Sequence, residues 1–163
     1  MSSASPSARL PSQRLTELGL SLPPVPAPQA AYVPAVVSRG LVYTSGQIPT
    51  ADGKLLATGK LGDAVDVAEG ARLARVCALN ALAAAASMAG PAGLDGIARI
   101  VKVVGFVASA PGFNRQPQVV NGASELLLDV FGDSGKHARS AVGMAELPLD
   151  APVEVELIAE LRS

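Results

Sequence analysis

The chain has 163 residues, of which 49% are hydrophobic and only 17% are charged, with 13 basic and 14 acidic side chains. This length predicts one domain with a real core, and a charged fraction below the average of about 25% suggests that another subunit covers some surface. The balanced charge and scarce aromatic residues argue against nucleic-acid binding, and no apolar run reaches the ~18 residues of a membrane span. One cysteine, Cys77, and no secretory-signal pattern fit a cytoplasmic protein.

The N-terminal segment differs in composition from the rest of the chain. Residues 1–13 are rich in Ser, Ala and Pro, so we expect a mobile tail in front of a single domain at 14–163. The first predicted element is a short helix at Arg14–Leu20, and a proline-rich connector follows it.

Two short strands are predicted next, at Tyr32–Val37 and Leu41–Ser45, with Ser38–Gly40 as the turn between them. Gly46 follows directly, where we expect the backbone to approach another group closely or to take an unusual angle. A second turn is predicted at Ala51–Lys54.

The middle of the chain predicts two helices with an apolar strand between them. The helices span Asp63–Ala89 and Gln116–Phe131, and Gly132 ends the second. The strand Ile97–Ala110 is so apolar that we expect both of its faces to be covered. One face of the first helix is lined by small residues that let it lie close to a sheet. These residues are Ala71, Ala74, Ala78, Ala81 and Ala85.

Two strands close the chain, at Ser140–Leu147 and Val153–Leu161, and the prolines between them predict a hairpin. In the last strand apolar residues alternate with glutamates, so one face is expected to point to the core. The order ββαβαββ predicts an α+β fold, a mixed sheet with two helices on one face. The other face carries both glutamates and Ile158, a mixture that a trimer packed through its sheets would explain.

Most sequence signatures of catalysis are absent. No paired Cys or His spacing predicts a metal site, and we expect neither a metal nor another cofactor. His137 is the only histidine and no serine lies in a nucleophile elbow, so a serine hydrolase triad has little support. Gly132–Gly135 lacks the ending of a phosphate-binding loop and is better explained as a helix stop.

Arg139 and Glu154 remain as candidates for chemistry. The planar arginine suits a carboxylate ligand, but from spacing alone an intersubunit salt bridge explains it better. Glu154 alone is more simply one solvated strand carboxylate among three. In a closing hairpin the two residues would lie near opposite ends, so a site that uses both would need a second subunit.

Four motifs between residues 43 and 159 point to a known family, and the resemblance spans roughly residues 32–161. They are Tyr43–Pro49 (YTSGQIP), Val120–Asn121 (VN), Ala138–Val142 (ARSAV) and Leu147–Ala159 (LPLDAPVEVELIA). Through these motifs, of which the last is the most specific, the chain resembles the YjgF/YER057c/UK114 family, also called the RidA family.

The resemblance implies a chorismate-mutase-like fold, a homotrimer, and sites for a small carboxylate-bearing metabolite in the clefts between subunits. Deaminases of the family hydrolyse reactive enamines and imines, such as 2-aminoacrylate, to 2-keto acids and ammonia. By this resemblance Arg139 would bind the substrate carboxylate and Glu154 would orient the attacking water. The residues that match substrate-binding positions are Tyr32, Ser45, Gly46, Asn121 and Ala141.

The chain departs from the deaminase pattern at three places. Ala30–Ala31 stands where Gly-Pro is typical, Ala141 replaces a frequent cysteine, and His137 replaces a common proline. Extra residues also lie before Tyr32 and around 50–62 and 90–96. Two other functions therefore stay open: a non-catalytic or regulatory trimer that binds a small carboxylate, and an endoribonuclease or translation inhibitor, which fits poorly with the acidic balance.

Overall fold

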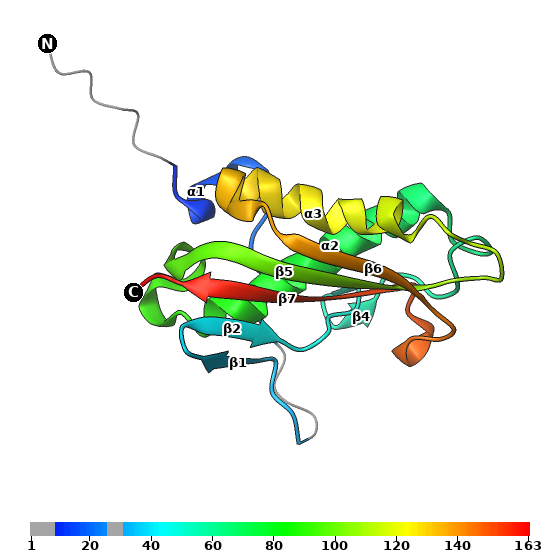
Figure 1. Ribbon diagram of the computed structural model, residues 1–163, viewed down its shortest axis with the longest axis horizontal. Helices are drawn as coiled ribbons and strands as arrows, with labels where there is room; N and C mark the ends of the chain where they lie inside the picture. The colour runs from blue at the N-terminus through cyan, green and yellow to red at the C-terminus, as the bar shows by residue number, and fades with distance from the viewer. Residues whose placement is uncertain (1–8, 26–30) are drawn as a thin grey trace, which may run out of the picture.

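Figure 1 shows the computed structural model of the chain, which describes residues 9–25 and 31–163. The α-helices are α1 (Pro11–Glu17), α2 (Val67–Ser87) and α3 (Gln116–Phe131). The strands are β1 (Ala35–Ser38), β2 (Leu41–Thr44), β3 (Thr50–Ala51), β4 (Lys54–Leu55), β5 (Ile97–Ala108), β6 (Ala138–Met144) and β7 (Val153–Leu161). Three short 3-10 segments connect them: η1 (Gly90–Gly96), η2 (Gly132–Gly135) and η3 (Pro148–Asp150).

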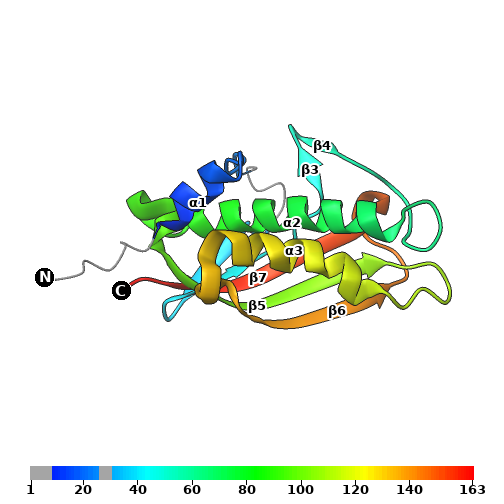
Figure 2. The same cartoon turned by 90° about the horizontal axis from the view of Figure 1, so that it is seen from above.

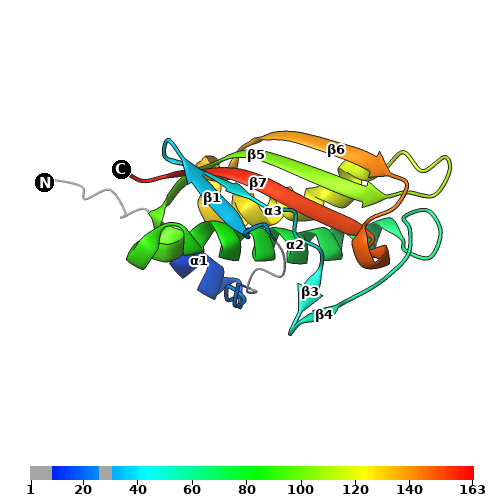
Figure 3. The ribbon, with the colours of Figure 1, turned by 90° about the horizontal axis from the view of Figure 1, so that it is seen from below.

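Five of the strands form one sheet in the order β1-β2-β7-β5-β6. Neighbours are antiparallel except β5 and β6, which run parallel because the chain crosses over through α3 between them. Helices α2 and α3 lie side by side across one face of the sheet, while the small β3–β4 hairpin stands apart (Figures 2 and 3). The expected α+β fold, with a mixed sheet and two helices on one face, is confirmed.

Both predicted tight turns are confirmed, and each is a two-residue hairpin turn. Between β1 and β2, Arg39 and Gly40 have positive φ angles of 50° and 78°. Between β3 and β4, Asp52 and Gly53 repeat this pattern with 51° and 74°. Two successive positive φ angles match the right-handed twist of the strands that they join.

The expected hairpin between the last two strands is wrong. β5 lies between β6 and β7 and pairs with both, so β6 sits at the edge of the sheet and β7 in its interior. The segment that contains η3 carries the chain from the end of β6 past β5 to the start of β7. The physical reason is that β5, with its long apolar sequence, gains hydrogen bonds along both edges when it is central.

The two faces of the sheet differ in burial. Along β7 the residues toward the helices are buried, from Val153 to Ala159, while Glu154, Glu156 and Ile158 on the other face are only half-buried. β5 alternates in the same way, with buried Val103 and Val107 toward the helices. The expectation that β5 is covered on both faces is therefore wrong for the single chain, since its second face meets no element among the described residues.

Small residues allow the two long helices to pack closely. Asp66 caps α2 by accepting a hydrogen bond from the Glu69 N–H (2.8 Å). Four of the five predicted alanines in α2 are buried, and the fifth, Ala71, is half-buried where α3 crosses it. A Cβ on Gly122 of α3 would overlap the main-chain carbonyl of Ala71, so only glycine permits this approach. The predicted bounds of α3 are confirmed, and Gly132 ends it with φ 58°.

The first helix begins earlier than expected. It spans Pro11–Glu17 instead of Arg14–Leu20, so the expected boundary at residue 13 falls inside α1, while residues 1–8 of the expected tail lie outside the described residues. Pro11 suits a first helical turn because its missing N–H is not needed there. Ser12 anchors the helix to Asp95 by its N–H (2.8 Å) and its hydroxyl (2.7 Å).

Cys77 of α2 packs in the hydrophobic core, as expected. Its side chain is fully buried, and burial raises the pKa of its thiol well above the ordinary value, which makes it an unreactive packing residue. No helix among the described residues is long and apolar enough to cross a membrane.

Candidate functional site

Arg139 points from β6 toward α3. Its register with Val103 of β5 places it on the helix-covered side of the sheet. Nη1 donates to Asn121 Oδ1 (2.9 Å) and to Ser124 Oγ (3.2 Å), and Nη2 lies 3.4 Å from the Pro117 carbonyl oxygen. All three acceptors are neutral, so the positive charge of Arg139 is held in place without being neutralised.

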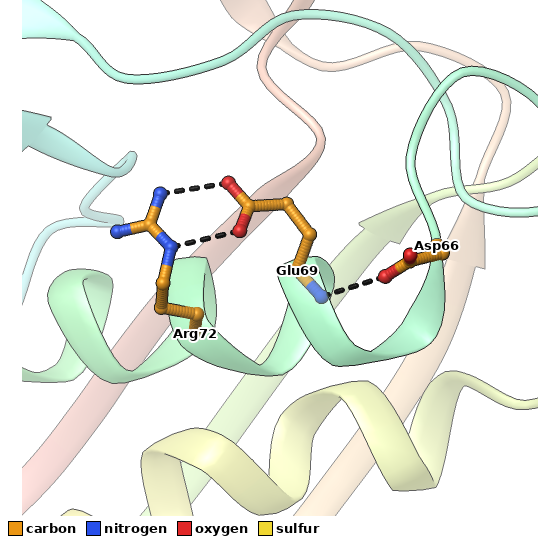
Figure 4. Close-up of polar contacts among 3 residues, drawn as sticks. All are labelled: Asp66, Glu69 and Arg72. Carbon is orange, nitrogen blue, oxygen red and sulfur yellow. Dashed lines mark hydrogen bonds and ion pairs between the residues drawn. The ribbon is translucent and has the colours of Figure 1, made fainter.

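One edge of the Arg139 guanidinium is still available. Both hydrogens of Nη1 are used, whereas Nε and one hydrogen of Nη2 meet no acceptor within the part of the chain that the structure describes. Arg72 shows what this edge can do, since its Nε and Nη2 hold the two Glu69 oxygens at 2.8 and 2.7 Å (Figure 4). Arg139 therefore offers the same paired donors for a carboxylate.

A histidine and a serine stand behind Arg139. Ser124 of α3 lies 2.9 Å from Nε2 of His137, and Nδ1 of His137 lies 2.6 Å from the Gly135 carbonyl oxygen. The sequence had marked His137 only as a departure from the family pattern and had not singled out Ser124. The signal was in the spacing, because Asn121 and Ser124 are three apart on a helix, and His137 lies two residues before Arg139, just ahead of β6.

Glu154 occupies the opposite face of the sheet. It is aligned with Phe106 of β5, and its carboxylate lies directly against Gly46, where a Cβ would overlap the carboxylate oxygen. This meets the expectation that the backbone at Gly46 approaches another group closely. Partial burial, with a smaller contribution from the charge of Glu156, raises the pKa of Glu154 above its ordinary value.

Ser45 and Tyr32 belong to the two chain segments that meet beside Gly46. Ser45 follows β2, next to Gly46, and its hydroxyl donates to the Val33 carbonyl oxygen (2.7 Å). Tyr32 precedes Val33 and leaves 60% of its surface exposed. Gln47 then joins this segment to Val155 of β7 through two main-chain hydrogen bonds.

The predicted site residues thus form two separate groups in one chain. We call Asn121, Arg139 and Ala141 the arginine group, and Tyr32, Ser45, Gly46 and Glu154 the glutamate group. Arg139 and Glu154 are two strands and three residues apart, which puts their Cα atoms roughly 14 Å from each other. They also point to opposite faces, so no single ligand of small size can touch both within one subunit.

Metal binding has no candidate site in this part of the structure. Among the described residues, no group of three or more His, Cys, Asp or Glu side chains is placed to hold an ion.

Comparisons with known proteins agree with this fold and these motifs. The family model described as "YjgF/chorismate_mutase-like, putative endoribonuclease" matches residues 12–161. Protein TCP17 of Trypanosoma cruzi is 44% identical over 150 residues, which cover 91% of this chain and 92% of that protein. Atu1372 of Agrobacterium tumefaciens, a protein of unknown function, is 47% identical with a TM-score of 0.85, covering 93% and 92%. E. coli TdcF with bound serine is 28% identical with a TM-score of 0.59, covering 85% and 94%.

Proposed function

The chain belongs to the YjgF/chorismate-mutase-like (RidA) family, and from this premise we propose that it hydrolyses reactive enamines and imines of small amino acids to 2-keto acids and ammonia. The substrates would be of the 2-aminoacrylate type. The reaction would take place between subunits, where the arginine group of one chain meets the glutamate group of another.

The observation that carries this proposal is the available edge of Arg139. A guanidinium that is fixed on one side by neutral acceptors and open on the other is suited to a planar carboxylate. The relative TdcF was solved with bound serine, a small amino acid.

Glu154 would supply the acid–base chemistry. The enamine first gains a proton from solvent water at its terminal carbon and loses one from nitrogen, which gives the imine, and water then attacks the imine carbon. Glu154 takes a proton from the attacking water and passes it to nitrogen, which gives a carbinolamine. It then moves the hydroxyl proton of the carbinolamine to nitrogen in the same way, so that the carbonyl forms as the carbon–nitrogen bond breaks and ammonia leaves. A raised pKa suits this transfer, because it makes the Glu154 carboxylate a stronger base toward water and brings its pKa closer to neutral pH, where a group can both gain and lose a proton.

The site requires assembly, so the oligomeric state is the first prediction. The sheet face opposite the helices exposes large apolar side chains, which a second and a third copy would cover. These side chains are Val36, Tyr43, Val142 and Met144. Light scattering at micromolar concentration is expected to give three times the chain mass of 16.4 kDa. A stable monomer would remove the proposed trimer and, with it, the shared site.

The reaction itself is tested with 2-aminoacrylate made in place by a dehydratase acting on serine. We expect the purified protein to speed the release of pyruvate and ammonia well above the uncatalysed rate, with turnover saturating in the supplied enamine. A protein that binds pyruvate by calorimetry but gives no acceleration would instead be the non-catalytic carboxylate-binding trimer of the same family.

A further inference from the structure

The hydrogen-bond chain behind Arg139 has a fixed direction. The Gly135 carbonyl oxygen can only accept, so Nδ1 of His137 must carry a proton. In the neutral ring Nε2 is then an acceptor, and Ser124 gives it its single hydroxyl proton. The lone pairs of Ser124 are left to accept from Nη1 of Arg139.

A doubly protonated ring would satisfy these groups less well. Nε2 would then donate to Ser124, whose hydroxyl proton would lose its partner among the described residues. With the neutral ring, every donor points the same way, from arginine to serine to histidine to the main chain. Aligned donors of this kind strengthen one another.

We propose that Ser124 and His137 are positioning residues of the carboxylate site, which fix the plane of the Arg139 guanidinium. This inference rests on the proposed role of Arg139 in binding substrate. Asn121 is exposed and holds only one hydrogen of Nη1, and the contact of Nη2 with the Pro117 carbonyl oxygen is long at 3.4 Å, so these two acceptors restrain the guanidinium only weakly. Ser124 takes the second hydrogen and, because His137 fixes its hydroxyl, locks the plane.

The ligand that gains from a locked plane is a flat carboxylate with two oxygens, such as a 2-keto or 2-imino acid. Its oxygens meet Nε and Nη2 together only when the guanidinium keeps one orientation. Because the guanidinium is already ordered before the ligand arrives, binding also costs less conformational entropy.

The first test uses no ligand. His137 is the only histidine of the chain, so the ring signals in a nitrogen–proton NMR spectrum belong to it alone. We expect the proton on Nδ1, and we expect the Nε2 signal to shift in Arg139→Lys, which disturbs the far end of the chain. A proton on Nε2 of the neutral ring, or an Nε2 signal that is the same in Arg139→Lys as in the wild type, overturns the proposal.

The second test measures 2-ketobutyrate binding by calorimetry. Ser124→Ala and His137→Leu are expected to bind about tenfold more weakly, the lower end of what orienting partners contribute at metal sites. His137→Gln is expected to stay within about threefold of the wild type, because its amide oxygen can accept from Ser124 where Nε2 did. Ser134→Ala, an exposed serine of η2, is the matched control and should bind normally.

The two tests separate this inference from the function on which it rests. If His137→Leu forms the normal assembly and binds 2-ketobutyrate as the wild type does, the positioning role is wrong while the function stands. If the glutamine variant assembles but binds as weakly as the leucine variant, the acceptor role of Nε2 is wrong as well. If the wild type binds no 2-keto acid, the proposed function fails, and the NMR result alone decides whether the chain orders Arg139.

Discussion

Replacing Arg139 with alanine is expected to weaken 2-ketobutyrate binding by about 3 kcal/mol or more, because the carboxylate would lose both donors in a partly dehydrated cleft. Arg139→Lys keeps the charge but offers one compact ammonium in place of two parallel donors, so we expect an intermediate loss. Calorimetry on the assembled proteins measures both effects.

The matched control for these variants is Arg72→Lys. Arg72 also makes a paired contact with a carboxylate, but on the exposed surface of α2 and within the chain. We expect this change to leave keto-acid binding unaltered. If Arg139→Ala bound keto acids as tightly as the wild type, Arg139 would be an intersubunit salt-bridge residue and the proposed mechanism would fail at its first step.

The local structure of this protein is readable from its sequence because it depends on neighbours in the chain. The bounds of α3 follow from its apolar period and from Gly132 at its end. The two hairpin turns follow from the glycine at the second position of each, Gly40 and Gly53, which takes a positive φ angle without strain. The last strand follows from strict alternation, and its predicted bounds, Val153–Leu161, are those observed.

The placement of the last two strands could not be obtained in the same way. A proline-bracketed turn between two strands favours a hairpin, but the choice of neighbour is made by β5, about 40 residues earlier, which pairs with both β6 and β7. Arg139 and Glu154 lie far apart within one chain, as expected, but for a different reason. They are divided by a strand and by the plane of the sheet, and do not lie at two ends of one hairpin.

The sequence motifs predict some residues of the candidate site, but not the contacts among them. The motifs point to Arg139 and Asn121, which do meet, at 2.9 Å. Ser124 and His137 complete the arrangement, yet neither belongs to a matched motif, and serine and histidine are common on helix and strand surfaces. Only the packing of α3 against β6 brings them to Arg139.

Replacing Glu154 with glutamine is expected to lower turnover by about a hundredfold or more, the usual contribution of a general acid or base. The amide keeps the shape of the side chain beside Gly46, so binding of 2-ketobutyrate should persist. The imine assay and calorimetry, run on the same samples, separate the two effects. Glu160→Gln, an exposed glutamate on the same face of β7, is the control and should turn over normally. Normal turnover in Glu154→Gln would rule out the acid–base role.

The raised pKa of Glu154 also predicts how the Glu154→Gln variant changes the stability of the fold with pH. Because the folded-state pKa of Glu154 is raised above the ordinary 4.5, the folded protein holds more protons than the unfolded chain between those two values. The contribution of Glu154 to stability therefore falls as pH rises through this window, and above it the native state carries a half-buried negative charge. Glu154→Gln removes that charge, so its melting temperature is expected to exceed that of the wild type at pH 7, with the difference shrinking toward pH 4.5. If Glu154→Gln melts at a lower temperature than the wild type at pH 7, another group in the assembled protein stabilises the ionised Glu154 carboxylate. The pKa of Glu154 would then not be raised in the site between subunits.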